Sequence, residues 1–393
     1  MTRASIARAL KARTIVVATL LVAVSCVPPP DNEPPGTTSS TTSSTTTTST
    51  SSTTTSTSTT TTSTTTTTTS TTSTTTTTST TTTTTSTTTT TTSTTTTTTT
   101  TTTPPAEPTR ISVVGDYGYN HPYILELGSL VDRLDPDAVA TTGDNLQIRE
   151  MPGYQGTDKY DRLVGRHFCR FMAGVAPGPH CPSGGDSPVN RFFPSAGNHD
   201  HDDGPLETYL DYFDLPGAGA TSTHPTGSEL YYDVLIGDVH VFVVDSESVS
   251  IEEEGGVPPV TTAAQRAWLE TALGESPAPW QVVVMHEPPF GSSAEYGSTP
   301  HLQWPYAQWG ADLVLNGHAA VYERVHRGGI PYVTNGLGGG YPGSFGTPIF
   351  GSMFRYAEDV ATTTLLTATP TSLRLELVTV EDEVIDTHVI TAP

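Results

Sequence analysis

Short apolar runs recur beyond residue 108, and each one stops at a Gly or a His. The clearest runs cover residues 110–114, 137–142, 191–196, 280–285 and 312–316. Runs of this length, rich in β-branched and other apolar residues and bounded by turn formers, are typical of buried β-strands. The pattern therefore predicts five buried strands, each followed by a tight turn.

Helical spacing is found between these runs. Apolar side chains recur at helical intervals over residues 123–134, which end before Pro136, and again over residues 265–273. Shorter helices are predicted over residues 161–172 and 206–213. A strand, a helix and a second strand in that order form a βαβ unit, so an α/β fold is expected.

Antiparallel strands are predicted in two further places. Residues 230–236 and 239–244 flank a Gly-Asp pair, which is a signal for a hairpin. The tail from residue 363 to residue 391 alternates apolar and polar positions. This alternation predicts two antiparallel strands that turn near Asp382.

Residues 1–26 have the composition of an export signal. Four basic residues precede an apolar run over residues 14–24, which is too short for a typical spanning helix of about 20 residues. Ser25 directly before Cys26 resembles a bacterial lipoprotein cleavage site, with Cys26 as the lipidated residue, although Ala23 stands where Leu is usual. Ordinary cleavage and release from the cell is the alternative.

Residues 27–108 predict a disordered linker rich in Pro, Thr and Ser. Every residue from 37 to 103 is Ser or Thr, so this tract has no apolar surface whose burial could offset the entropy of ordering. Thr-rich tracts flanked by Pro resemble mucin-like stalks that carry O-linked sugar. This tract is interpreted as a spacer between the domain and the cell surface, and a neutral expansion of a repeat is the alternative. The folded domain is then expected over residues 109–393.

The net charge of −23 lies mostly in that domain. Binding to nucleic acid is not expected, because neutralising phosphates requires basic patches. No second apolar run is long enough to span a membrane, so membrane contact is expected only through a lipid anchor. The sequence does not indicate an oligomeric state.

The three cysteines support export. Cys169 and Cys181 lie in a Gly- and Pro-rich segment and predict a disulfide in an oxidising compartment. Lipidation of Cys26 would then account for the odd cysteine. Two unpaired buried thiols are the alternative.

Metal-binding side chains follow five of the predicted strands. Ligand sites in open α/β sheets lie beyond the carboxyl ends of the strands. Each of these residues alone has a structural explanation as a turn former, a helix cap or a packing histidine. Together they predict one shared metal site, with these ligands: Asp116, Asp144, Asn198 (beside His199), His286 and His318.

The chain from Arg110 onward resembles the calcineurin-like metallophosphoesterase superfamily, and within it the purple acid phosphatase branch. It shows Asp-x-Gly at residues 116–118, Gly-Asn-His-Asp at 197–200 and Val-x-x-His at 283–286. Gly-Asp-x-x-Tyr is matched in part at residues 143–147, and Gly-His-x-His in part at 317–320. The resemblance covers the whole predicted domain.

This resemblance implies an α/β fold, a β-sandwich of two mixed sheets flanked by helices, that hydrolyses phosphate esters with two metal ions. In such enzymes a metal-bound hydroxide attacks the phosphate ester. Asp144 would bridge the metals, and Asp116 would hold the first. Asn198, His286 and His318 would complete the second metal. His199 would face the leaving oxygen, and Asp200 would orient it.

Two departures from the family pattern deplete the first metal site. Gln147 and Ala320 stand where the family has a Tyr and a His that bind the first metal. Two carboxylates can still hold a cation such as Mg²⁺, Mn²⁺ or Ca²⁺, but they should hold Fe³⁺ poorly, and no purple colour is expected. The amide oxygen of Gln147 is one candidate substitute ligand. Three histidines are weaker candidates: His121, His201 and His326.

Two functions remain open from the sequence. The first is an exported, acid phosphatase-like phosphoesterase, anchored in the cell envelope or secreted. The second is a degenerate domain that keeps the fold and acts as a binding or structural module of the envelope. Zn, Mn, Fe, Mg and Ca are not distinguished, nor are monoester and diester substrates. Specificity is expected from loops that carry no readable code: residues 151–190, 246–260, 290–301 and 338–352.

Overall fold

The computed structural model describes residues 107–119, 122–147, 151–202, 206–339 and 341–392. The predicted export signal, Cys26, the Thr- and Ser-rich tract and His121 lie outside the described residues. Among the described helices, none is both long enough and apolar enough to cross a membrane.

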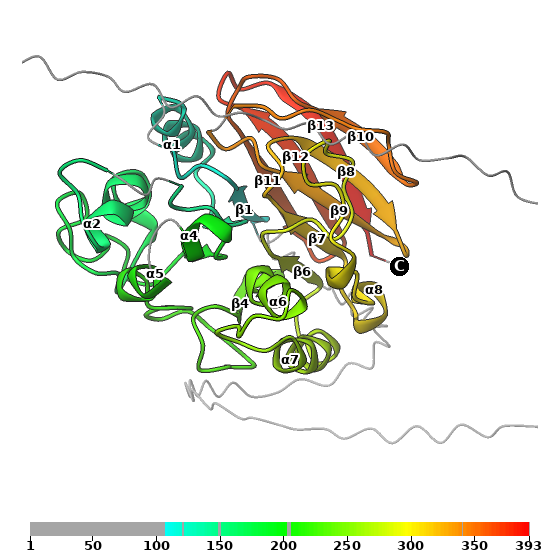
Figure 1. The fold of residues 1–393 in the computed structure, drawn as a ribbon, viewed down its shortest axis with the longest axis horizontal. Helices are drawn as coiled ribbons and strands as arrows, with labels where there is room; N and C mark the ends of the chain where they lie inside the picture. The colour runs from blue at the N-terminus through cyan, green and yellow to red at the C-terminus, as the bar shows by residue number, and fades with distance from the viewer. Residues whose placement is uncertain (1–106, 120–121, 148–150, 203–205, 340, 393) are drawn as a thin grey trace, which may run out of the picture. The chain divides into compact units, whose positions relative to one another are not determined.

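The first sheet has six strands in the order β13-β12-β11-β1-β2-β3 (Figure 1). Strands β1, β2 and β3 pair in parallel, and the remaining neighbours are antiparallel, so the sheet is mixed. The bounds are β1 Thr109–Val114, β2 Ala138–Thr141, β3 Phe192–Pro194, β11 Thr362–Thr369, β12 Ser372–Thr379 and β13 Val384–Thr391.

The second sheet has seven strands in the order β10-β8-β9-β7-β6-β5-β4. Its centre is parallel, from β5 through β6 and β7 to β9, with antiparallel strands on both sides. The bounds are β4 Tyr232–Ile236, β5 Val239–Val243, β6 Trp280–Val284, β7 Leu313–Asn316, β8 Tyr322–Arg327, β9 Ile330–Asn335 and β10 Ser352–Tyr356.

Alternating side chains of the second sheet enter two different cores. On β6, Val282 and Val284 join the core that also contains Ile111 and Leu366 of the first sheet. Between them, Val283 points to the opposite face and packs in the core that contains helices α7 and α8. Because successive side chains of a strand face opposite ways, a strand buried on both faces reads as the continuous apolar run seen in the sequence.

Helices cover the outer faces of the two sheets. Helix α1 packs through Leu130 against Leu365 and Val378 of the first sheet. Helices α6, α7 and α8 cover the second sheet (Figure 1). The expected fold of two mixed sheets flanked by helices is confirmed. The helices are α1 Tyr123–Leu134, α2 Thr157–Tyr160, α3 Arg166–Phe168, α4 Asn198–Asp202, α5 Leu206–Tyr212, α6 Ser246–Glu253, α7 Thr262–Gly274 and α8 Tyr306–Trp309, with shorter helical turns at Asp161–Gly165, Cys169–Phe171 and Pro300–Leu302.

The prediction of two strands in the tail was wrong, because the tail forms three. An additional turn at Pro370 and Thr371 separates β11 from β12. A turn of two residues preserves the period of two, so the alternation continues through it and conceals it. The helix predicted over residues 161–172 is present as a continuous helical segment whose geometry passes from π through α to 3-10.

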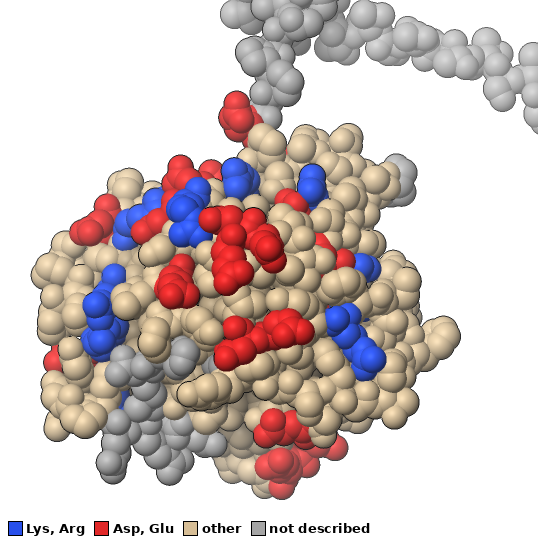
Figure 2. Space-filling view, turned by 90° about the horizontal axis from the view of Figure 1, so that it is seen from above, with Lys and Arg blue, Asp and Glu red and all other residues tan. Residues whose placement is uncertain are grey.

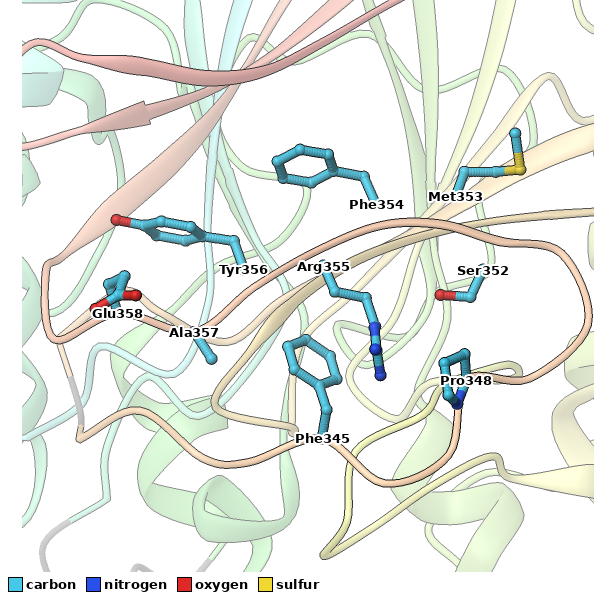
Figure 3. A pocket seen from close by; sticks show the side chains of 9 residues that line it. All are labelled: Phe345, Pro348, Ser352, Met353, Phe354, Arg355, Tyr356, Ala357 and Glu358. Atoms are coloured by element: carbon cyan, nitrogen blue, oxygen red, sulfur yellow. The ribbon is translucent and has the colours of Figure 1, made fainter.

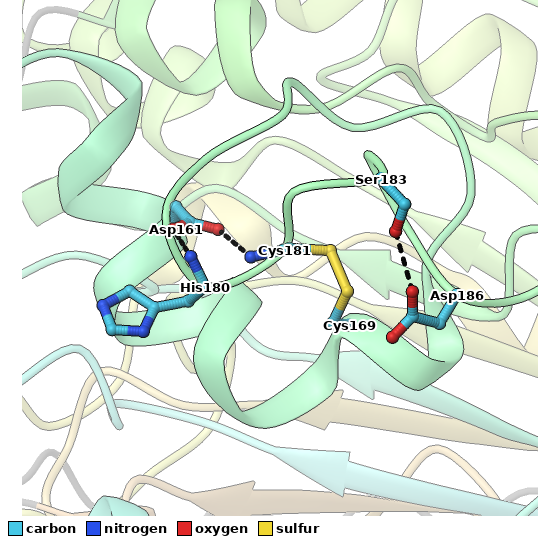
Figure 4. Close-up of a disulfide and its surroundings, with 6 residues drawn as sticks. All are labelled: Asp161, Cys169, His180, Cys181, Ser183 and Asp186. Atoms are coloured by element: carbon cyan, nitrogen blue, oxygen red, sulfur yellow. Dashed lines mark hydrogen bonds between the residues drawn. A yellow bond between two sulfur atoms is a disulfide. The ribbon is translucent and has the colours of Figure 1, made fainter.

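A disulfide joins Cys169 and Cys181, as expected from the sequence (Figure 4). The buried carboxylate of Asp161 accepts hydrogen bonds from the backbone N–H groups of His180 and Cys181, at 2.6 and 2.9 Å. The disulfide and these hydrogen bonds fix the same loop from both sides. They tie parts of the segment between β2 and β3 to one another.

Charged residues are unevenly distributed over the face shown in Figure 2. Acidic side chains gather in its middle, and basic side chains stand mostly toward its edge. This face therefore carries no continuous basic patch of the kind that binds phosphate backbones.

The disulfide should contribute measurably to stability. Replacing Cys169 and Cys181 together by Ala should lower the free energy of unfolding by about 3 kcal/mol, because the bond closes a short loop of the unfolded chain. Urea denaturation of the two proteins measures the difference. Dithiothreitol should destabilise the wild type and leave the double variant unchanged. Equal stability of the oxidised wild type and the variant would contradict the prediction.

Candidate metal centre

The predicted ligands converge where the carboxyl ends of strands from the two sheets meet. Asp116 follows β1 and Asp144 follows β2 in the first sheet, whereas His286 follows β6 in the second. Ligand atoms of these three residues lie within 4.8 Å of one another. Since no single sheet supplies the cluster, its geometry requires that the two sheets be packed together.

Two further ligands complete the cluster. The Oδ1 atom of Asn198 lies 3.0 Å from Nε2 of His286 and 3.0 Å from Nδ1 of His318. The two histidine nitrogens are 3.1 Å apart, and Nε2 of His286 is 3.3 Å from Oδ1 of Asp144. An amide oxygen, two imidazole nitrogens and a carboxylate oxygen thus surround one small volume. This donor set suits a divalent cation such as Zn²⁺, Mn²⁺ or Fe²⁺.

The histidines are in the protonation state that binds metals. Nδ1 of His286 lies 2.7 Å from the carbonyl oxygen of Thr142. Because that oxygen can only accept, Nδ1 carries the proton and the lone pair of Nε2 faces Asp144. Burial lowers the pKa of His286 and of His318 to about 3, so both rings are neutral.

The carboxylates of the site carry negative charge into a buried region. Burial, followed by repulsion from Asp144, raises the pKa of Asp116 well above its ordinary value. The same two causes raise the pKa of Asp200 to about 6. A buried carboxylate without a counter-charge is costly, and the neutral histidines provide none. A bound cation would offset this cost, so the residues fit a metal.

The backbone at three ligands is strained. Asp116, Asp144 and His318 have positive φ angles of 57°, 53° and 66°, in the left-handed region where a non-glycine residue costs roughly 1–3 kcal/mol. Packing next to the ligands is also tight. A Cβ atom at Gly197 would collide with the Asp144 carboxylate, and one at Gly143 would meet the ring of His286. Glycine at both positions lets the ligand loops approach each other.

Asp200 lies fully buried beneath the loop that carries Asp144. Its Oδ2 atom accepts from the backbone N–H of Gly197 and from both the backbone and side-chain N–H groups of Asn145, at 2.9–3.1 Å. Its Oδ1 atom accepts from the N–H of Leu146 at 3.1 Å and from the hydroxyl of Tyr160 at 2.9 Å. These five hydrogen bonds position the metal-ligand loops. The role expected from the resemblance, orienting His199, stays a prediction.

His199 stands at the edge of the cluster. Its backbone N–H donates to Oδ1 of Asp144 at 3.0 Å, and its Nε2 lies 4.0 Å from Oδ2 of the same carboxylate. The ring is partly exposed and lines the cavity above the ligands. A substrate held in that cavity would therefore meet this imidazole.

The cavity over the cluster has a volume of about 260 Å³. Both positions that depart from the family pattern, Gln147 and Ala320, line it together with Asp116. Gln147 is 8% exposed, and its side-chain nitrogen has no hydrogen-bond partner among the described residues. An amide in this setting is free to turn its oxygen toward a cation.

Two histidines considered as substitute ligands lie elsewhere. His326 is exposed on β8 and lines a different hollow. Nε2 of His201 lies 3.3 Å from Oδ1 of Asp245, and both side chains are buried. Neither residue lines the cavity over the metal cluster.

Four large side chains of the cavity were not singled out from the sequence: Tyr119, Glu295, Tyr296 and Tyr341. The last three lie in loops 290–301 and 338–352, from which specificity was expected. The ring of Tyr296 lies 4.0 Å, centroid to centroid, from that of His318. Burial, followed by the charge of Glu295, raises the pKa of Tyr296 to about 12. Each tyrosine adjoins a glycine in the sequence, which is the only available signal, and it is a weak one.

A wider hollow of about 590 Å³ lies along β10 and the loop before it (Figure 3). It shares no lining residue with the cavity over the cluster, and the nine residues drawn there include no His or Asp. Its one carboxylate among these residues is Glu358, so it lacks the cluster of donors found at the candidate metal site.

The fold and the site define a metal-binding α/β protein whose candidate ligands lie where two mixed sheets meet. The sequence model of the calcineurin-like phosphoesterase family matches residues 109–322, so the chain belongs to this family. Its members use divalent metals. Asp116, Asp144 and His286 form the candidate metal site of this chain.

Comparisons with individual proteins support the same assignment. The chain is 29% identical over 150 residues to an uncharacterised Mycobacterium tuberculosis protein, covering 34% of this chain and 28% of that one. It is 28% identical over 160 residues to a Glycine max purple acid phosphatase, covering 36% and 32%. The chain thus spans about a third or less of these relatives' lengths.

A solved structure shares the fold. Purple acid phosphatase PPD1 from yellow lupin matches with a TM-score of 0.56 and 17% identity, over 72% of this chain and 54% of that one. At this level of identity the likeness shows the fold alone.

Asp200 should be essential to the stability of the site. Asp200→Ala removes the acceptor of five hydrogen bonds and should lower the free energy of unfolding by about 3 kcal/mol. Asp211→Ala, at an exposed position of α5, is the matched control and should change stability by less than about 0.5 kcal/mol. Urea denaturation measures both variants, and equal effects would show that Asp200 has no special role.

Proposed function

We propose that this protein is an exported metal-dependent phosphoesterase that resembles acid phosphatases and hydrolyses small phosphate esters. The observation that carries the proposal is the convergence of Asp116, Asp144, Asn198, His286 and His318 beneath an open cavity. A purely structural domain has no need for neutral histidines and buried carboxylates facing the same volume.

Divalent cations at this site would supply Lewis-acid polarisation of the phosphoryl oxygens and would acidify a water molecule. Ligand atoms of Asp144 lie within 4.8 Å of those of both Asp116 and His286, so Asp144 would be shared by the two ions. Asn198, His286 and His318 would hold the second ion, and Asp116 would hold the first.

His199 is the residue to serve the leaving group. Its imidazole lines the cavity beside Asp144, and its backbone is anchored to that carboxylate. A proton on Nε2 would be donated to the oxygen that leaves phosphorus, or would stabilise the negative charge that develops there. Asp200 supports this step indirectly, because it fixes the turn from which His199 projects.

Export is supported by the disulfide. Disulfides persist in oxidising compartments, and the bond between Cys169 and Cys181 lies in the described domain. The N-terminal segment with the composition of a signal, and the Ser- and Thr-only tract after it, fit a protein held on the cell surface by a lipid at Cys26 or released.

The function is tested with an activated aryl phosphate as substrate. Wild-type protein should hydrolyse it only when Mn²⁺, Zn²⁺, Mg²⁺, Ca²⁺ or Fe²⁺ is supplied. Asp144→Asn should reduce kcat/KM more than about 100-fold, since removing even the outer partners of metal ligands costs ~10–100-fold. Asp211→Asn, at the exposed position on α5, is the matched control.

If no aryl phosphate is hydrolysed with any of these metals, the proposed phosphoesterase activity is rejected. The result would then favour the second candidate, a degenerate domain that keeps the fold as a binding or structural module. This alternative is supported by Gln147 and Ala320, which depart from the family pattern and line the cavity.

We also propose that the first metal site is depleted. Gln147 and Ala320 line the cavity where two further ligands would be needed, so the first ion should bind more weakly than the second. Gln147→Tyr combined with Ala320→His should raise the metal content by a second equivalent. Equilibrium dialysis with elemental analysis measures it. Two equivalents of equal affinity in the wild type would contradict the prediction and would favour the Gln147 amide as a ligand.

A further inference from the structure

Three tyrosines from separate loops line the metal cavity. Tyr119 follows β1, Tyr296 lies between β6 and β7, and Tyr341 follows β9. Their exposed fractions are 40%, 46% and 78%. Large aromatic side chains are rarely left exposed together without a function. All three side chains line the cavity, so a group that enters it would meet these rings.

The loops that carry these rings are tied to one another and to the metal ligands. Ser293 and Phe345 form an isolated β-bridge, and Ala294 donates to the carbonyl of Ser344 at 2.9 Å. Buried Glu323 accepts from the hydroxyl of Ser292 at 2.6 Å, which fixes the same loop to β8. The segments before Tyr296 and after Tyr341 are therefore built as one unit.

Tyr119 is anchored on the other side of the cavity. The N–H of Gly118 donates to the carbonyl of Asp144 at 3.0 Å, and that of Gln147 donates to the carbonyl of Gly118 at 2.9 Å. The ring of Tyr296 packs on His318 at 4.0 Å. The aromatic rim is thus placed within reach of any phosphate held by the metal ligands.

The charge of the rim is negative. Glu295 lines the cavity beside the three tyrosines, and no Lys or Arg is among its described lining residues. Among these described residues, an ester with several phosphates would meet no Lys or Arg side chain. A positively charged substituent would instead meet a carboxylate and electron-rich rings, the combination that recognises quaternary ammonium groups.

We propose that the preferred substrate is a phosphate monoester whose alcohol carries a quaternary ammonium group, of which phosphocholine is the simplest example. This inference rests on the proposed function. The phosphate lies on the metal ligands, and the ammonium lies among Tyr119, Tyr296 and Tyr341 beside Glu295. The cavity of about 260 Å³ is smaller than the ~300–1,000 Å³ of a typical drug-sized pocket, which suits so small an ester.

The reaction balances with water alone. The ester P–O bond breaks, a new P–O bond forms to the oxygen of water, and the leaving alkoxide takes up a proton to give the free amino alcohol. The products are inorganic phosphate and the alcohol, and neither an oxidant nor a reductant is needed.

The first test measures binding without turnover. Full-length protein is titrated by calorimetry with choline and with its neutral isostere 3,3-dimethylbutanol. Choline should bind at least about tenfold more tightly, in the range of a cation–π contact. Tyr296→Leu and Tyr341→Leu should each weaken choline binding about 3- to 30-fold, whereas Tyr296→Phe retains the ring and should retain the preference. Phe350→Leu, an exposed aromatic in a different hollow, is the control.

The second test compares hydrolysis of phosphocholine and 3,3-dimethylbutyl phosphate. The ratio of their kcat/KM values should be at least about ten in the wild type and in Tyr296→Phe, and should fall toward one in Tyr296→Leu and Tyr341→Leu. Using a ratio cancels any general effect of the substitutions on the metal site.

The outcomes separate the two proposals. A ratio near one in the wild type, or choline bound no better than its isostere, overturns the substrate inference even if aryl phosphates are hydrolysed. If no phosphate ester is hydrolysed with any metal, the proposed phosphoesterase activity is rejected. The choline titration then decides by itself whether the tyrosines recognise ammonium groups.

Discussion

The arrangement of the site depends on the cost of burying negative charge where the two sheets meet. Asp116, Asp144 and Asp200 are all nearly inaccessible to solvent. Asp200 is compensated by five hydrogen bonds from the loops around it. Asp116 and Asp144 each accept a backbone N–H, from His318 and His199 respectively. They face the neutral rings of His286 and His318, which supply no positive charge. The remaining imbalance is what a divalent cation would neutralise.

This constraint accounts for the local backbone as well as for the side chains. The ligand loops approach so closely that Gly143 and Gly197 leave no room for a Cβ atom, and several ligands adopt left-handed backbone conformations. Such strain is retained only where the surrounding structure enforces it. Here, packing of one sheet on the other holds Asp144 against His286. Stability of the core and geometry of the site are therefore two consequences of the same interface.

The sequence predicted the parts of this structure that a local pattern determines. Apolar runs revealed β1, β6 and β7, because strands buried on both faces contain few polar residues, and the ligand at each strand end followed from the α/β rule. The third strand of the tail was hidden, because a two-residue turn at Pro370 leaves the alternation intact. The role of Asp200 and the tyrosine rim depend on contacts between distant loops, such as Ser293 with Phe345. No local pattern encodes those contacts.

The central claim is that ligands from both sheets hold a metal between them. Crystals of the protein grown with Mn²⁺ or Zn²⁺, and measured at the absorption edge of the metal, locate the ion directly by its anomalous scattering. The account predicts a peak between Asp144 and His286, within coordination distance of Asn198 and His318. The absence of a peak there at saturating metal, or a peak only at surface carboxylates, would contradict it.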